Sequence, residues 1–226
     1  MEMNIIAHIH SDFDTKFGIP RQSGIVDELE STIVFEPEYR NAEALRGLDG
    51  FSHIWLIWQF SEAVRDKWSP TVRPPRLGGN KRIGVFATRS PFRPNSIGLS
   101  SVRLGKIEYT GESGPVIHVF GADLMDGTPI LDIKPYLPFT DSHPNASSGF
   151  AEQTKGYSLD VEFPEELIGV LPEDKRSGAV GILAHDPRPS YQSDETRVYG
   201  VNYAGCNIRF TVSGNLLKVI SVDPIK

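Results

Sequence analysis

The stretch GVFATRSPFRPNSIGLS, residues 84–100, decides how the rest of the chain is read. Pro91 and Pro94 fix their own φ angles and restrict the residues before them, so this backbone has few conformations to lose on folding. Ile83, Val85 and Ala87 alternate with their neighbours, which predicts a strand leading into the loop. Residues 97–99 predict a second strand that leads out of it.

Two arginines, Arg89 and Arg93, lie four residues apart within this loop. A guanidinium fork on a stiff loop can recognise a carboxylate or a phosphate at low entropic cost. The alternative is a proline-rich hairpin with solvated arginines. We favour an anion site, because the basic residues extend well beyond the loop.

The charge of the chain is unevenly distributed. Residues 65–106 contain ten basic side chains and one acidic one, a formal charge of +9, whereas the rest of the chain carries −15 of the net −6. A basic segment in an acidic protein indicates a local site for a polyanionic partner, unless acidic neighbours in the fold balance it. The ten basic residues are Arg65, Lys67, Arg73, Arg76, Lys81, Arg82, Arg89, Arg93, Arg103 and Lys106.

The composition favours β structure. With 21 Gly and 17 Pro in 226 residues, the chain is rich in turns, which is typical of many short strands. The single cysteine, Cys206, excludes an internal disulfide framework and favours a reducing compartment. The first ten residues do not resemble a signal peptide, and no apolar run reaches the ~20 residues of a membrane span. We therefore expect a soluble, cytoplasmic protein.

The order of predicted elements suggests two parts, residues 1–150 and residues 151–226. The most apolar run, residues 51–60, predicts a buried central strand. Asn41 is a candidate N-cap for a short helix at residues 42–45. In the second part, short helices are predicted near residues 164–166 and 177–185. The predicted strands cover residues 4–9, 31–35, 51–60, 97–109, 115–123, 128–133, 157–163, 197–203, 206–212 and 216–222.

Common enzyme signatures are absent: the chain has no Gly-x-Gly-x-x-Gly fingerprint, no Walker loop, no His-Glu-x-x-His pair and no Gly-x-Ser-x-Gly elbow. Three loops could instead form a site together, namely residues 20–22, 89–95 and 120–129. Their arginines, amides and carboxylates suit a zwitterionic, nucleoside-like ligand, since an arginine can bind a carboxylate and a carboxylate can bind a ribose or an amine. For Asp126 followed by Gly127, turn formation is the preferred interpretation.

Four segments in this order resemble the TsaA-like (TrmO) family: GVFATRSPFRPNSIGLS, TVRPPRLGGN, DGTPILDIKPYLPF and DPRPSY. The resemblance implies a mainly β fold, in which a single small β-barrel that binds the cofactor is followed by a smaller α+β C-terminal domain. It also implies a homodimer with an S-adenosyl-L-methionine-dependent tRNA methyltransferase activity. The implied substrate is the N6 nitrogen of threonylcarbamoyladenosine, next to the anticodon of a threonine tRNA.

The resemblance also implies which residues of this sequence contact the cofactor, namely those at positions that match the family's contacts. Ser61 and Glu62 stand where some relatives have His-Gln. The complete implied set of cofactor-binding residues is Pro20, Arg21, Gln22, Ser61, Glu62, Arg89, Leu99, Phe120, Gly121, Ala122 and Asp123.

The expected mechanism is direct methyl transfer governed by orientation. Asp123 and Asp126 are the candidate catalytic bases. Tyr136 and Phe139 could stack on the substrate base or pack on the barrel. The alternatives are an S-adenosylmethionine-binding RNA-associated module without turnover and a small-molecule methyltransferase, in which the basic segment would serve dimerisation.

Overall fold

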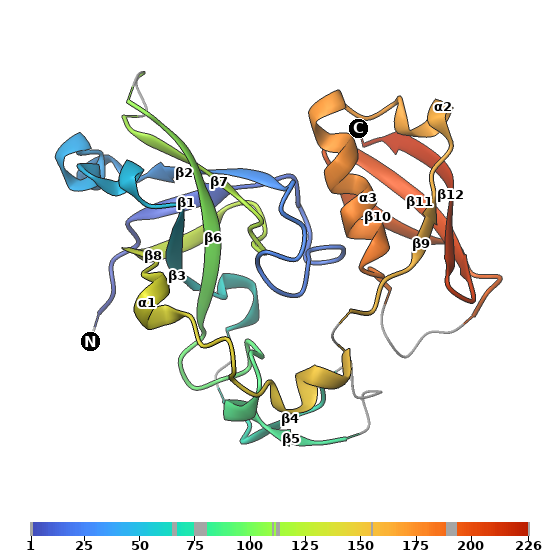
Figure 1. Ribbon diagram of the computed structural model, residues 1–226, viewed down its shortest axis with the longest axis horizontal. Helices are drawn as coiled ribbons and strands as arrows, with labels where there is room; N and C mark the ends of the chain where they lie inside the picture. The colour runs from blue at the N-terminus through green and yellow to red at the C-terminus, as the bar shows by residue number, and fades with distance from the viewer. Residues whose placement is uncertain are drawn as a thin grey trace.

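The fold has a closed barrel and a separate C-terminal sheet (Figure 1). The computed structural model describes residues 2–64, 67–74, 81–109, 111, 114–154, 156–188 and 194–225. Six antiparallel strands close the barrel in the order β1-β2-β7-β6-β3-β8. These strands are β1 (Ala7–His10), β2 (Glu30–Phe35), β3 (His53–Gln59), β6 (Ile97–Glu108), β7 (Val116–Phe120) and β8 (Thr128–Pro135).

Alternation of side chains along the strands builds the barrel core. Along β3, Ile54 and Leu56 are fully buried, whereas Trp55 and Ile57 alternate with them on the partly exposed outer face. The central strand predicted at residues 51–60 is confirmed as β3, which pairs with β6 and β8, and only one of its faces is buried because it belongs to a barrel with one inward face. Gly98 of β6 allows the buried Trp58 ring to pack against the backbone, since a Cβ there would lie 2.2 Å from the indole Cε2.

The segment leading into the arginine loop differs from the prediction. Strand β5 covers only Ile83–Gly84 and pairs with β4 (Thr71–Val72), and the 3₁₀ turn Val85–Ala87 follows. The expected strand is therefore limited to two residues, because β4 offers only Thr71 and Val72 for pairing. The strand that leaves the loop is confirmed as the start of β6. The predicted cap is also confirmed: Asn41 accepts a hydrogen bond from Glu43 N at the 3₁₀ turn Ala42–Leu45.

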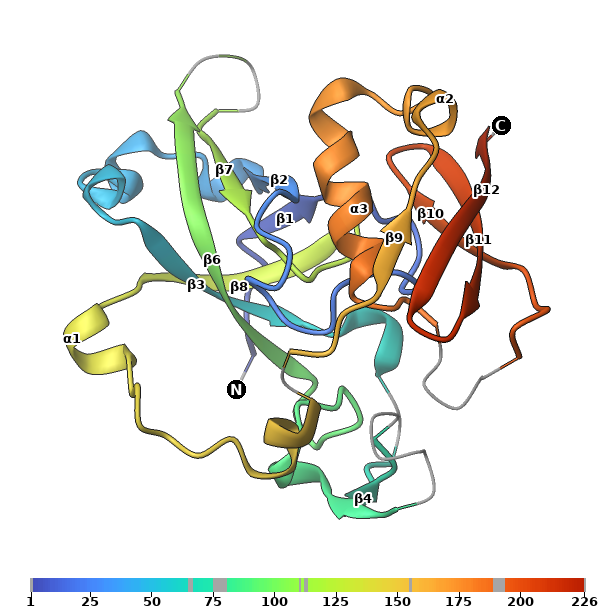
Figure 2. The ribbon, with the colours of Figure 1, turned by 45° about the vertical axis from the view of Figure 1, so that its right-hand side comes forward.

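The C-terminal sheet has the order β10-β11-β12-β9 and is covered by α3 (Figure 2). β10 (Tyr199–Tyr203), β11 (Cys206–Ser213) and β12 (Leu216–Pro224) are antiparallel neighbours, and β9 (Asp160–Glu162) pairs with β12 in parallel. The α-helices among the described residues are α1 (Pro138–Asp141), α2 (Glu165–Ile168) and α3 (Arg176–Ala184). A mainly β chain with a barrel and a smaller α+β part is thus confirmed. No described helix is long and apolar enough to cross a membrane.

The C-terminal core includes residues from near the N-terminus. Phe13, Val26 and Leu29 belong to the same buried cluster as Phe210 and Leu183. The barrel residues form a second cluster of their own. The segment 11–29 therefore leaves the barrel after β1, packs on the C-terminal unit and returns to the barrel at β2. A division of the chain at residues 150 and 151 stays a prediction.

Polar contacts hold the same segment in place. Lys175 Nζ lies 2.6 Å from the carboxylate of Asp12, and Asn202 Nδ2 donates to Asp14. Both partners of the Lys175–Asp12 pair are mostly buried, so solvent screens their attraction less than at the surface.

The β4–β5 hairpin lies beside the 3₁₀ segment Gly149–Thr154 in both views (Figures 1 and 2). Part of the basic segment, residues 65–106, lies outside the described residues. Arg65, Arg76, the remainder of TVRPPRLGGN at residues 75–80 and residues 189–191 of DPRPSY lie outside the described residues.

Candidate functional site

Three sequence-distant loops meet at one end of the barrel. The backbone N–H of Gly24 donates to the carbonyl of Gly121 at 2.9 Å, which joins the first loop to the end of β7. Arg89 Nη1 donates to Gln22 Oε1 at 2.5 Å, which joins the first loop to the arginine loop. The residues predicted to converge are therefore neighbours in the fold.

Gly121 is required where the first and third loops cross. Its φ of +74° is one that side-chain-bearing residues rarely adopt. A Cβ at this position would also lie 3.3 Å from the Gly24 Cα and 3.2 Å from Asp27 Oδ1. The close approach of the two backbones thus depends on glycine.

Asp123 is the carboxylate at the centre of this arrangement. Its Oδ1 accepts a hydrogen bond from the Ser100 hydroxyl at 2.6 Å, and Ser100 Oγ in turn accepts from Trp58 Nε1 at 3.0 Å. Burial raises the pKa of the Asp123 carboxyl, and the Ser100 hydrogen bond, backbone N–H groups including that of Ser23, and the positive charge of Arg89 partly oppose this rise. Asp123 is therefore a desolvated carboxyl in electrostatic contact with an exposed arginine.

The first loop also contacts the C-terminal unit. Arg21 Nη2 donates to the carbonyl of Arg188 at 3.3 Å. The Arg188 guanidinium is itself bound by Asp186, with Nε–Oδ1 at 2.8 Å and Nη2–Oδ2 at 3.0 Å. Asp186 also accepts from the Tyr157 hydroxyl. The first half of DPRPSY thus positions the loop that contains Arg21.

Arg93 has a different environment from Arg89. Its Nη1 donates to the carbonyl of Thr88 at 3.0 Å and lies 3.4 Å from that of Ser90. Arg93 therefore stabilises the backbone of its own loop, whereas Arg89 extends from the loop and binds Gln22. The two arginines do not form a single anion fork.

The remaining predicted cofactor residues fall into two groups. Pro20 and Ala122 are buried, and Leu99 lies on the outer face of β6 with 51% of its surface exposed. Phe120 lies under the Arg103 guanidinium, whose carbon is 4.0 Å from the ring centroid.

Ser61 and Glu62 belong to an exposed 3₁₀ turn that follows β3. The turn begins beside the end of the arginine loop, because Phe60 N donates to the carbonyl of Ser96. No described contact links Ser61 or Glu62 to Arg89, Gln22 or Asp123.

Asp126 lies in a different environment from Asp123. Its Oδ1 is 3.2 Å from His10 Nδ1 and accepts from Ser11 N at 3.1 Å, so it joins the turn after β1 to the turn before β8. Gly127 follows with a φ of +74°, as the turn interpretation requires. Of the two candidate bases, only Asp123 has a described interaction with Ser23, next to the first loop, and with Arg89 of the arginine loop.

The two candidate stacking residues also differ. Tyr136 packs on the rings of Trp55 and His53, with centroids 5.5 and 6.1 Å away. Phe139, in α1, leaves 83% of its surface exposed. Tyr136 therefore takes the packing role, and Phe139 has no such packing.

Sequence reasoning missed Ser100 and Trp58. Both lie in segments that were noted for their strand patterns. The sequence did contain a signal for Ser100, because it is a polar residue at an inward position of an alternating strand. A buried hydroxyl requires a polar partner, which pointed to a polar group inside the barrel end.

Both parts of the chain match a known family. The tRNA-methyltransferase O N-terminal domain matches residues 8–142, and the TrmO C-terminal domain matches residues 157–225. The chain belongs to the TrmO family. A relative from Escherichia coli (strain K12), named tRNA (adenine(37)-N6)-methyltransferase, is 40% identical over 97% of this chain and 96% of its own length.

Two further relatives come from Pseudomonas aeruginosa. One, from strain PAO1, is named "Putative S-adenosylmethionine-dependent methyltransferase RcsF" and is 42% identical over 87% of this chain and 86% of its own length. The other is a crystal structure of TrmO with a TM-score of 0.80 and 33% identity, covering 99% of this chain and 97% of that one. The resemblance read from the four sequence segments is confirmed.

Proposed function

We propose that this protein transfers a methyl group from S-adenosylmethionine to the N6 nitrogen of threonylcarbamoyladenosine at position 37 of a tRNA. The chain is an S-adenosylmethionine-dependent tRNA (adenine(37)-N6)-methyltransferase of the TrmO family. The threonylcarbamoyl group on the substrate, and the roles of individual residues, are our proposals. The observation that supports the assignment of residues is the convergence of three loops around Asp123, at the positions where the family resemblance implies cofactor contacts.

The groups at this convergence suit the chemistry of the cofactor. S-Adenosylmethionine is a zwitterion with a carboxylate, an ammonium group and an apolar adenosine. We assign Arg89 to the carboxylate, because its guanidinium is exposed and is positioned by Gln22. The exposed side chain of Leu99 offers an apolar surface for the adenosine, and the carboxylate of Asp123 suits an amine or a ribose hydroxyl.

When bound, the cofactor supplies a methyl group activated by a positively charged sulfur. The protein supplies orientation, which can account for much of the rate of such a transfer. The carbonyl attached to N6 in the modified base makes loss of its proton easier than in plain adenine. We propose Asp123, in its ionised form, as the group that accepts this proton, because a carboxyl whose pKa is raised is better matched to that task.

We further propose a homodimer in the cytoplasm, both implied by the family resemblance. The basic segment would contact tRNA phosphates. Phosphate contacts fix the register of a nucleic acid, while base contacts select the sequence.

Methyl transfer to purified tRNA tests this function. The expected result is that tRNA bearing threonylcarbamoyladenosine gains one methyl group on that nucleoside, measured by mass spectrometry after digestion, while the same tRNA without the threonylcarbamoyl group gains none. Methylation of both tRNAs would overturn the proposed substrate and leave the enzyme class intact. Cofactor binding without transfer to either tRNA would support a binding module, and transfer to a small molecule alone would support the third alternative.

A further inference from the structure

Two large aromatic side chains next to the β4–β5 hairpin form an exposed pair. Trp68 and Phe86 flank the β4–β5 hairpin, and their ring centroids are 6.1 Å apart with an angle of 28° between the planes. Trp68 exposes 51% of its surface and Phe86 exposes 72%. A stacked, solvent-exposed aromatic pair offers an apolar surface on which another flat group can stack.

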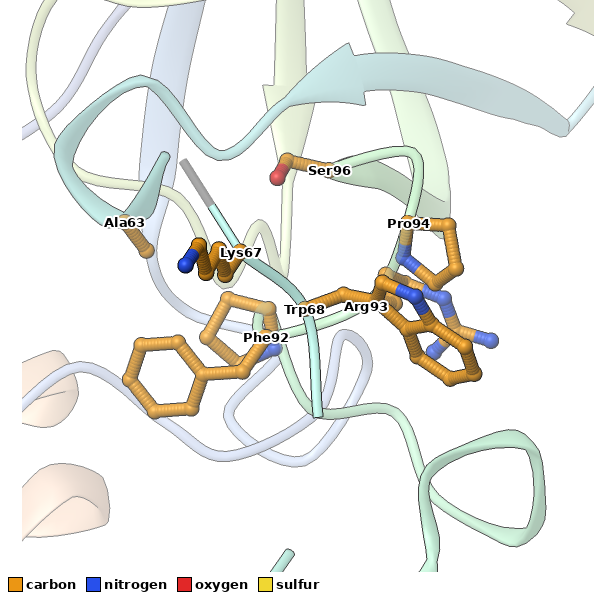
Figure 3. A pocket seen from close by; sticks show the side chains of 8 residues that line it. Ala63, Lys67, Trp68, Phe92, Arg93, Pro94 and Ser96 are labelled. Carbon is orange, nitrogen blue, oxygen red and sulfur yellow. The ribbon is translucent and has the colours of Figure 1, made fainter. Parts of the chain in front are cut away.

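Trp68 of this pair also lines a small pocket (Figure 3). Its volume is about 150 Å³. In Figure 3, Trp68, Arg93 and Pro94 lie on one side of the pocket, and Ala63 and Phe92 lie on the other. Its lining residues are Ala63, Lys67, Trp68, Pro91, Phe92, Arg93, Pro94 and Ser96.

The size and charge of the pocket restrict what it can bind. A volume of about 150 Å³ is below the roughly 300 Å³ of the smallest typical ligand sites, so one planar ring fits better than a whole cofactor. Lys67 and Arg93 are both cationic, and no carboxylate occurs among the lining residues. Aromatic rings next to cations are the features that bind an unpaired nucleotide, by stacking on its base and pairing with its phosphate.

The arginine loop contributes residues both to the pocket and to the proposed cofactor site. Arg93, which lines the pocket, binds the carbonyls of Thr88 and Ser90 on either side of Arg89. The four backbone steps from Arg89 to Arg93 can span at most about 14 Å even when the chain is fully extended. A group in the pocket therefore lies close to Arg89 and is held by the same stiff loop.

We propose that this pocket and the Trp68–Phe86 pair bind one unpaired nucleotide of the tRNA anticodon loop, close in sequence to the adenosine that is methylated. The base stacks on Trp68, and its phosphate pairs with Lys67 and Arg93. This contact orients the loop so that the target base meets the cofactor site. The proposal rests on the proposed function and adds the recognition of a second nucleotide.

A coupled substitution experiment tests the pocket. The probes are anticodon stem-loop RNAs that contain threonylcarbamoyladenosine and have one loop nucleotide at a time replaced by an abasic one. We expect Trp68→Ala to weaken binding of the intact stem-loop by roughly 5- to 150-fold, the range for loss of one stacked base. Trp68→Phe should retain most of the affinity. Tyr109→Ala, which removes an equally exposed ring at the far end of β6, should have no effect.

The position of the abasic nucleotide identifies the contact. At one loop position, the abasic change should weaken binding to the wild-type protein but not to Trp68→Ala, because the stacking contact is already lost. The affinity of each variant for S-adenosylmethionine, measured by calorimetry, should remain at the wild-type value. Circular dichroism establishes that each variant is folded.

Two results would overturn the proposal, and they are distinguishable from failure of the function itself. Unchanged RNA affinity in Trp68→Ala, or equal losses for every abasic probe in both proteins, would exclude a stacked nucleotide at this pocket while wild-type methyl transfer continues. Loss of affinity for a protein partner with unchanged RNA binding would instead identify a protein-docking surface. Absence of methyl transfer by the wild-type protein would remove the proposed function, and this inference with it.

Discussion

Ser100 donates a hydrogen bond to Asp123 across 2.6 Å, and it does so from the inner face of the barrel. Because Trp58 donates to the same hydroxyl oxygen, the Ser100 hydrogen is free to point at the carboxylate. Hydrogen bonds from the barrel interior therefore set the orientation of Asp123, while the positive charge of the exposed Arg89 attracts its carboxylate.

Asp123→Asn should change how stability depends on pH. The folded-state pKa of Asp123 lies above its unfolded value, so the stability linked to its protonation is fully present below the unfolded pKa of roughly 3.9 and is lost as the pH rises through the folded pKa. The variant cannot ionise there. Relative to wild type, it should become progressively more stable from about pH 4 upward.

Urea unfolding at a series of pH values measures this difference. Asp126→Asn is the matched control, because it makes the same chemical change at the exposed turn beside His10. A constant stability difference between Asp123→Asn and wild type across the whole pH series would contradict the desolvated environment assigned to Asp123.

Ser100→Ala should destabilise the protein at neutral pH. A hydrogen bond to a charged group contributes about 1.5–3 kcal/mol, and its loss leaves both the Asp123 carboxylate and Trp58 Nε1 without their partner. Ser101→Ala, the next residue on the opposite face of β6, should have an effect of about 0.5 kcal/mol or less. Equal effects of the two substitutions on the free energy of unfolding would argue against the Trp58–Ser100–Asp123 chain as a stabilising feature.

Arg89→Ala should weaken S-adenosylmethionine binding with little loss of stability. The Arg89 side chain is exposed and its described hydrogen bond is to Gln22, so the fold does not depend on it. Calorimetric titration measures the affinity. Arg82→Ala is the control, because Arg82 is also exposed but bonds to Thr71 within the β4–β5 hairpin. Wild-type affinity in Arg89→Ala would remove Arg89 from the cofactor site.

The basic segment should show a graded effect on tRNA binding. Arg73 and Lys81 are exposed and have no acidic partner among the described residues, whereas Lys106 is paired with Glu108. If the first two contact phosphates, Arg73→Ala and Lys81→Ala should each reduce the slope of log affinity against log salt by about 0.7–0.9. Cofactor affinity should stay near the wild-type value.

Lys106→Ala is the internal control for this salt series, because its charge is already balanced. The expected slope for Lys106→Ala is that of wild type. If all three variants retain the wild-type slope, the segment does not form the tRNA surface. A lower melting temperature with an unaltered slope would indicate a purely structural role.

A fragment comprising residues 151–226 should not fold by itself. Its buried cluster lacks Phe13, Val26 and Leu29, and removing even Phe13 alone by Phe13→Ala should cost about 3–5 kcal/mol in the full chain. Circular dichroism of the fragment, with and without a synthetic peptide of residues 11–29, measures the effect. A cooperative thermal transition of the fragment alone would show that the N-terminal segment is dispensable.

The barrel could largely be predicted from the sequence because its strands follow a two-residue alternation between turns. The barrel strands β2, β3 and β7 illustrate this, with buried residues at every second position. The prediction failed at Val85–Ala87, where a local apolar pattern became a 3₁₀ turn. A strand pattern of that length depends on a pairing partner, and β4 offers only two residues.

The site could be predicted only in part. The three loops were found because their glycines, prolines and arginines are unusual at short range. The link from Ser100 to Asp123 and the link from Arg21 to Arg188 join residues far apart in the chain. Such pairs depend on how the barrel closes and how the C-terminal unit packs, which short-range patterns do not determine.

The segment 11–29 contains the Pro20–Gln22 loop between two groups of residues buried in the C-terminal core. Opening of the C-terminal sheet must therefore disturb that loop. By thermodynamic linkage, a molecule bound at the loop disfavours such opening and slows hydrogen exchange at the amides of β10 and β11. The last strands of the chain thus report whether a loop near its beginning is occupied.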